Sequence, residues 1–204
     1  MPRPAATSPD DLTDALIRVV AGHGLDAVSI RSVAREAGVS LGTVQYHFAT
    51  KDQLLLAAYR RVIDDVTARA REIAARDAGP AAYIRALLHE LLPLDDRREA
   101  ELRVAVAFTA RSVHSPSLTE LYTDGHRALT GAIAGALQLA IARGEAAPGV
   151  DPRRDATHVV ALADGLAWHL LCAPSTLTPA DALAALDAQL DRLLPGIAGA
   201  PGPY

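Results

Sequence analysis

Apolar residues in this chain recur at spacings of three and four positions in one segment after another, and no segment shows the strict alternation of a half-buried strand. Gly and Pro separate these segments, and several of them open with a helix-capping residue, as Ser8 does directly before Pro9. Ala and Leu, which lose little freedom on entering a helix, are abundant, while aromatic residues make up only 4% of the chain. We therefore expect an all-α protein.

Caps and breaks predict where each helix begins and ends. Ser8 caps the first helix and Gly22 ends it. The second helix follows a cap at Ser29 and breaks at Gly38, the third follows a cap at Ser40 and runs to about Phe48, and the fourth opens with a capping box at 50–53 and lasts until 77–80. Further helices are expected at 81–92, 97–114, 117–143, 153–172 and 179–194, which brings the total to about nine.

Bulk properties narrow the class of protein. Half of the 204 residues are apolar and 22% are charged, as in a globular protein and unlike a disordered one. No apolar run is long enough to span a bilayer and the N-terminus lacks the layout of a signal peptide, so we expect a cytoplasmic protein without membrane contact. The single Cys172 excludes an internal disulfide framework and a cysteine zinc site, and we expect no metal and no cofactor. The net charge of −4 does not by itself suggest a nucleic-acid partner.

The segment from Ser29 to Phe48 carries the functional signal. Two short helices joined by a tight turn containing Gly38 and Ser40 have the layout of a helix-turn-helix. In that motif the second helix enters the major groove of DNA while the first lies across the phosphate backbone. Val44 and Phe48 are four positions apart and should pack inward, which leaves the other side of the second helix for DNA.

The residues of this segment closely resemble the DNA-binding domain of the TetR family. The resemblance is carried by SIRSVAREAGVS at 29–40, LGTVQYHF at 41–48 and KDQLL at 51–55, and it covers roughly residues 8–60. The remaining chain resembles the family in length and helical layout, with some likeness to members related to the choline-responsive regulators. The resemblance implies a three-helix DNA-binding domain at 1–50, followed at 51–204 by a helical domain for effector binding and dimerisation.

The resemblance also implies the DNA-binding residues. Thr43, His47 and Lys51 match positions that typically touch phosphate in the family, and Leu41, Gln45 and Tyr46 are candidates for base contacts on the outward side. Many members have Tyr where this chain has Gln45, and that Tyr usually contacts the backbone, so Gln45 can take either role. Gly42 permits close approach to the groove. The remaining candidates around the turn are Ser29, Arg31, Ser32 and Ser40.

The expected function is a repressor that binds a palindromic operator in double-stranded DNA as a homodimer and is released by a small molecule. Leucines at spacings of three and four in the last helix suggest a dimer seam, although both last helices could instead pack inside the protomer. The candidate interface residues are Leu162, Gly165, Leu183, Leu186, Leu190 and Leu193. The candidate effector-binding residues are Phe108, Arg111, Tyr122, His126, Trp168 and His169.

Plainer roles remain open for several of these residues. Trp168 could belong to the core, and Arg111 and His126 could pair with Asp124 or Glu120. His158 and His169 lie three turns apart, too far for one metal ion. Gly-rich phosphate loops, nucleophile elbows and metal-spaced His/Glu pairs are absent from the sequence, which gives little support to an enzyme. The alternatives are a regulator without a ligand or controlled by a partner protein, and a small helical enzyme.

Overall fold

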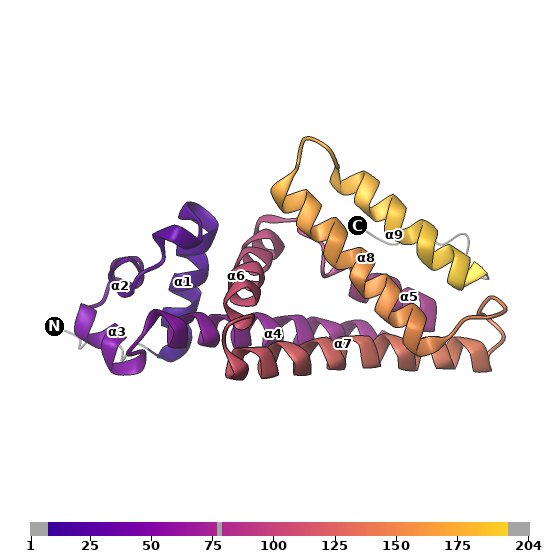
Figure 1. Cartoon of the computed structure of the whole chain (residues 1–204), viewed down its shortest axis with the longest axis horizontal. Helices are drawn as coiled ribbons and strands as arrows, with labels where there is room; N and C mark the ends of the chain where they lie inside the picture. The colour runs from indigo at the N-terminus through magenta and orange to yellow at the C-terminus, as the bar shows by residue number, and fades with distance from the viewer. Residues whose placement is uncertain (1–7, 77–78, 196–204) are drawn as a thin grey trace. The chain divides into compact units, whose positions relative to one another are not determined.

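A computed structural model describes residues 8–76 and 79–195, and within them the chain is helical with no strand (Figure 1). The helices are α1 (Pro9–His23), α2 (Ile30–Ala37), α3 (Leu41–His47), α4 (Lys51–Ala75), α5 (Pro80–His89), α6 (Asp96–Ser112), α7 (Pro116–Ala142), α8 (Pro152–Cys172) and α9 (Pro179–Leu193), with a short 3₁₀ turn η1 (Leu25–Ala27) after α1. The all-α prediction of nine helices is confirmed for the described residues. Asp77 and Ala78, part of the predicted break after the fourth helix, lie outside them.

Helix starts lie where the capping residues predict them. The Ser8 hydroxyl accepts a hydrogen bond from the Asp11 amide at 3.1 Å, and the Asp11 carboxylate accepts one from the Ser8 amide at 2.8 Å. These hydrogen bonds from Ser8 lower the pKa of the Asp11 carboxyl, because they favour its charged form. Ser29 with Ser32 opens α2, and Thr178 with Asp181 opens α9, by the same reciprocal arrangement.

The chain divides into two compact units, each built from two stretches of sequence. The first unit takes in residues up to 67 together with 95–122, and the second takes in 68–94 together with 123 onwards. Both α4 and α7 therefore contribute residues to both units. The domain boundary expected after residue 50 falls inside the first unit, which also takes in the first part of α4 and the whole of α6.

The core of the first unit joins α1, α4 and α6. Leu12 and Leu16 of α1 are fully buried, as are Leu54 of α4 and Phe108 of α6. The Phe108 ring stacks on Tyr59 with centroids 3.7 Å apart. The sequence assigned Phe108 to the effector site; in the protomer its side chain has no exposed surface and packs in this core.

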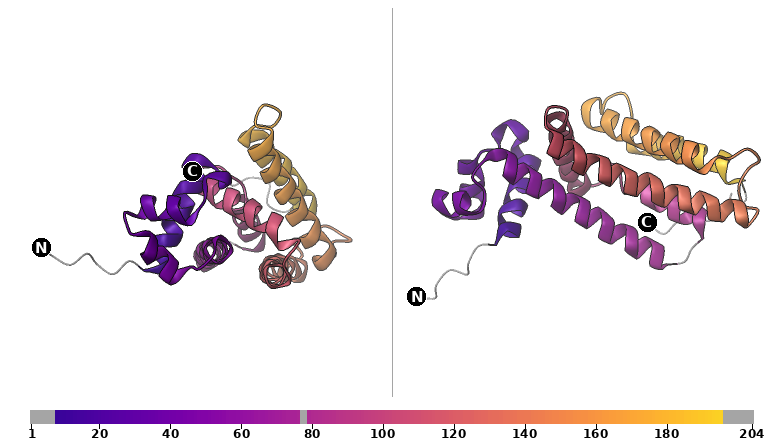
Figure 2. Two further views of the ribbon diagram at one scale, coloured as in Figure 1. Left: turned by 60° about the vertical axis from the view of Figure 1, so that its left-hand side comes forward. Right: turned by 60° about the horizontal axis from the view of Figure 1, so that its bottom comes forward.

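In the second unit α5, α8 and α9 pack together, and α8 and α9 run side by side in opposite directions (Figure 2). Ion pairs join α5 to α9: Arg85 contacts Asp187 and Asp191, and His89 lies 3.0 Å from Asp187. Three of the four leucines in the α9 seam are buried within the protomer. These three, which the sequence assigned to a dimer interface, are Leu186, Leu190 and Leu193.

Candidate nucleic-acid interface

The turn between α2 and α3 depends on a glycine. Gly38 adopts the left-handed conformation with φ of 67°, which side chains with a Cβ rarely adopt. Its amide donates to the carbonyl groups of Ala34 and Arg35 and so ends α2. Two residues later the Ser40 hydroxyl accepts from the Thr43 amide at 3.0 Å and starts α3. This sequence of cap, break and cap holds the two helices as a helix-turn-helix.

One side of α3 is buried and the other is open. Val44 is completely buried and Phe48 retains 7% exposure, so the predicted inward side is confirmed. Tyr46 is 86% exposed, so most of its ring meets solvent in the protomer. Leu41, Gly42 and Gln45 are exposed on the same helix. The side of α3 turned away from the core therefore offers Leu, Gln and Tyr side chains to an external partner.

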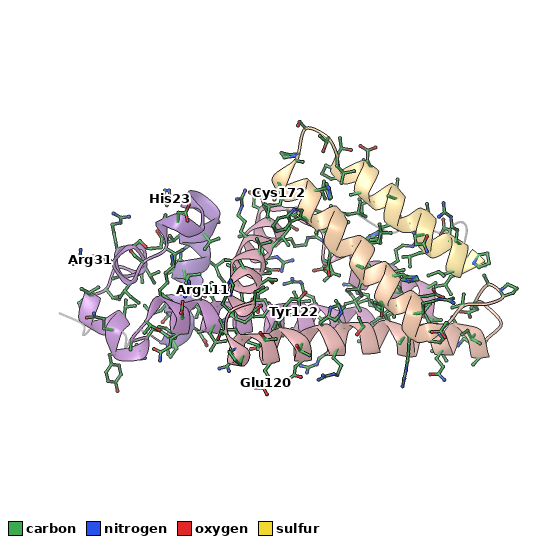
Figure 3. All side chains as sticks on the ribbon, viewed as in Figure 1. His23, Arg31, Arg111, Glu120, Tyr122 and Cys172 are labelled. Carbon is green, nitrogen blue, oxygen red and sulfur yellow. The ribbon has the colours of Figure 1, made fainter. Side chains whose placement is uncertain are left out.

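The polar candidates around α3 divide into those engaged locally and those available. Ser29 and Ser32 hydrogen-bond to each other as the cap of α2, and Thr43 bonds to Ser40, so these hydroxyls already fix the helix starts. Arg31 projects from the outer side of α2 and makes no hydrogen bond or ion pair to the described residues (Figure 3). His47 packs edge-on against Tyr46, with ring centroids 5.0 Å apart.

Lys51 is the first residue of α4, directly after the cap residue Thr50. The free amide groups at a helix start attract anions, so a lysine there suits a phosphate. Asp52 follows it, and the guanidinium of Arg111 on α6 donates to the Asp52 carboxylate at 2.6 Å. Arg111 was expected to bind effector or to pair with Asp124 or Glu120. The structure pairs it with Asp52, and Asp124 pairs with Arg127.

The other predicted effector residues lie in different parts of the chain. Tyr122 belongs to the first unit, whereas His126, Trp168 and His169 belong to the second. Trp168 is 50% exposed, so it is not a core residue of the protomer. His169 donates from Nδ1 to the carbonyl of Gly165 at 2.7 Å, one turn back on its own helix.

Asp164 is a residue that sequence reasoning missed. It lies one turn before Trp168 on α8 and keeps accessible surface, yet the surrounding protein raises the pKa of its carboxyl by desolvation. His126 on α7 opposes that shift, because its positive charge would favour the carboxylate. The sequence signal for it is an acid within the otherwise apolar stretch at 159–168.

The remaining dimer candidates are not buried by the protomer. Leu162, Gly165 and Leu183 are partly exposed, and a Cβ on Gly165 would meet no atom within 4 Å. No helix of the described residues is long and apolar enough to cross a membrane. Among those residues no group of His, Cys, Asp and Glu side chains has the arrangement needed to hold a metal ion.

The helix α3 is exposed on one side, is joined to α2 by a glycine turn and is followed by a lysine at the start of α4. This arrangement is that of a helix-turn-helix DNA-binding protein. Comparison with known proteins specifies the family. Residues 12–58 match the model of the bacterial regulatory proteins of the tetR family, and residues 80–195 match that of the BetI-type transcriptional repressor C-terminal region. The chain belongs to the TetR family of transcriptional regulators, with a C-terminal region of the BetI type.

Individual relatives agree with this placement. The chain is 32% identical to the HTH-type transcriptional regulator PksA of Bacillus subtilis over 164 residues, which cover 80% of this chain and 78% of that protein. A transcriptional regulator from Rhodococcus sp. Rha1 has a similar structure, with a TM-score of 0.80 and 36% identity over 96% of this chain and all of the other. A putative regulator from Saccharomonospora viridis, solved in complex with choline, shares the fold with a TM-score of 0.78 and 24% identity over 90% and 93% of the two chains.

Proposed function

We propose that this chain is a ligand-responsive repressor that binds a palindromic operator as a homodimer and has no catalytic activity. The observation that carries the proposal is the exposed side of α3, where Tyr46 is 86% exposed beside Gln45 and Leu41. A two-fold dimer presents two such helices, which match successive major grooves when they lie about 34–36 Å apart. A regulator of this kind in a bacterium acts where its DNA is, in the cytoplasm.

Base reading and phosphate binding fall to different side chains in this proposal. Gln45 can bond bidentately to adenine, and Leu41 can pack on a thymine methyl group. Lys51, His47 and Thr43 contact phosphate, and Arg31 extends the contact across the backbone. The capping hydroxyls of Ser29, Ser32 and Ser40 reach phosphate while they fix the helix starts. Gly42 keeps the start of α3 close to the groove, because a side chain there would push it away.

The proposed effector is a small cation bound beside α8. Asp164 supplies an exposed carboxyl whose pKa is raised by desolvation, and Trp168, one helical turn further, supplies an aromatic face. A bound cation would pair with the carboxylate of Asp164 and lie over the indole ring of Trp168. The choline bound to the regulator from Saccharomonospora viridis has this chemistry. Leu162 lies on nearly the opposite side of α8 from Asp164, which leaves that side for the partner protomer.

Control follows from a shift between two populations of the dimer. In one population the two α3 helices are spaced to bind the operator, and in the other they are not. The effector needs to favour the second population by only ~1–3 kcal/mol to change operator occupancy substantially. In each protomer α4 begins at Lys51 and continues into the second unit. Displacement of α4 in both protomers would therefore move the phosphate contact of Lys51 at both half-sites.

Two variants test the DNA contacts. Lys51→Ala should weaken binding about equally for all sequences and reduce the salt slope by about 1, since one phosphate contact is lost. Tyr46→Ala should change the preferred sequence instead. Anisotropy titrations on an operator and on a scrambled duplex separate the two effects. Equal behaviour of both variants on both duplexes would contradict this division of roles.

The effector proposal has an internal reporter, because Trp168 is the only tryptophan of the chain. Titration with choline should change Trp168 fluorescence, and Asp164→Asn should weaken the apparent affinity about tenfold or more. Asp124→Asn, which removes an equal charge from an exposed ion pair on α7, serves as the control and should leave the affinity unchanged. An unchanged fluorescence would exclude choline as a ligand of this site.

A further inference from the structure

The ion pair between Arg111 and Asp52 lies at the start of α4. Arg111 is in the last turn of α6, and its Nη2 donates to Oδ2 of Asp52 at 2.6 Å. Asp52 is the second residue of α4 and directly follows Lys51. Both side chains of the pair are 49% exposed. The pair is thus a solvent-accessible contact beside the expected phosphate contact of Lys51.

Packing, rather than this pair, holds α6 in the first unit. Val104 and Phe108 are completely buried in the core, and Phe108 stacks on Tyr59 of α4. Half-exposed ion pairs contribute little to stability, because solvent screens them and two long side chains must be ordered. The ion pair between Arg111 and Asp52 therefore adds little to the stability of the first unit.

Charge gives a stronger explanation. An acid in the first turn of a helix is favourable, because it meets the positive end of the helix dipole. The same carboxylate next to a DNA phosphate is unfavourable, since like charges repel over distances shorter than the Debye length. Asp52 therefore favours the formation of α4 and opposes the approach of DNA to Lys51.

We propose that Arg111 is a positioning residue for DNA binding, which masks the carboxylate of Asp52 and so permits phosphate to reach Lys51. A guanidinium is charged at every physiological pH, and its fork of N–H donors suits a carboxylate. The pairing of Arg111 with Asp52 is therefore independent of pH in that range. This inference rests on the proposed function, because it takes Lys51 as a phosphate contact. It adds a residue of α6, outside the helix-turn-helix, to the determinants of operator affinity.

The test uses the full chain and an operator duplex at about 0.1 and 0.3 M salt. Arg111→Gln should weaken binding about three- to tenfold at the lower salt and less at the higher, as expected for loss of a screened charge contact. Arg103→Gln is the matched control, because Arg103 is also on α6 and pairs with an acid of its own helix, Glu99. It should change the affinity less than about twofold.

The companion variants separate a mask from a brace. Asp52→Asn alone should bind DNA as tightly as the unmodified chain or more tightly, and the double variant with Arg111→Gln should recover the affinity lost by Arg111→Gln. If Asp52→Asn weakens binding as much as Arg111→Gln and the double variant recovers nothing, the pair is a brace and the inference is wrong. An effect of Arg111→Gln no larger than that of Arg103→Gln would also overturn it.

Lys51→Gln distinguishes failure of the inference from failure of the proposed function. If Lys51→Gln weakens operator binding while Arg111→Gln matches its control, only the masking role is lost. If neither variant weakens binding, both the masking role and the placement of phosphate at the start of α4 are wrong. Thermal unfolding of each variant confirms that differences in affinity come from folded protein.

Discussion

Tyr59 of α4 and Phe108 of α6 stack with their ring planes only 8° from parallel and their centroids 3.7 Å apart. Both rings are buried, Phe108 completely. This contact makes α6 part of the unit that holds the helix-turn-helix, although α6 lies well beyond the DNA-binding domain predicted at 1–50. Residues of α6 complete the apolar core formed by α1 and α4. The unit that holds the helix-turn-helix therefore needs α6, from the middle of the chain, to complete its core.

Phe108→Ala should destabilise the chain by about 3–5 kcal/mol, because it removes a large buried ring and leaves a cavity beside Tyr59. Chemical denaturation followed by circular dichroism measures this loss. Phe108→Leu keeps most of the volume and should cost less than about 1.5 kcal/mol. If Phe108→Ala leaves the free energy of unfolding almost unchanged, α6 does not pack on α1 and α4 as described.

Gly42→Ala should leave the fold intact and weaken operator binding about tenfold, because the added methyl group meets only the Ser40 hydroxyl at 3.7 Å in the protomer but would face the groove. Gly38→Ala provides the contrast. Its left-handed φ of 67° makes the substitution strained, so it should lower the free energy of unfolding by about 1 kcal/mol. Operator binding by Gly42→Ala at unmodified affinity would remove the case for close approach at this position.

Gly165→Glu should shift the protein from dimer toward monomer without unfolding the protomer. A Cβ at Gly165 meets no atom within 4 Å, so the protomer can hold the larger side chain, while a charge in a partner interface would be desolvated. Sedimentation velocity measures the dimer fraction, and we expect a dissociation constant raised at least about tenfold. An unchanged dimer fraction would place the interface elsewhere.

Stability at acid pH should depend on Asp155. The hydrogen bond from Arg154 lowers the pKa of the Asp155 carboxyl below its ordinary value of 3.8, and the Asp151 amide adds to that shift. A lowered pKa in the folded state contributes stability that is present above pH 3.8 and is lost as the pH falls through the folded value. Asp155→Asn should therefore cost about 1–2 kcal/mol near pH 7 and much less near pH 3, as urea titrations at both pH values would show. An equal loss at both pH values would assign the effect to packing.

Local signals predicted the helices well. Ser8, Ser29, Ser40 and Thr178 each cap a helix within one turn of their own position, so neighbouring residues contain the whole signal. The inward side of α3 was equally predictable, because Val44 and Phe48 follow from the helical period.

Which helix lies opposite a given side chain could not be predicted from local spacing. Leu186 and Leu190 have the spacing of a dimer seam, but the same spacing serves packing on α8, and the structure buries both within the protomer. Arg111 pairs with Asp52, 59 residues away, a contact that no local pattern encodes. Trp168 is half exposed although its size and apolar character favour a core position.

The central claim is that a dimer of this chain recognises a palindromic operator through α3. Titration of the purified protein against DNA from around its own gene, at two salt concentrations and with a scrambled duplex as control, tests it most directly. We expect saturable, salt-sensitive binding to one palindromic site, with one protomer for each half-site. Weak binding that is equal for every duplex would contradict it.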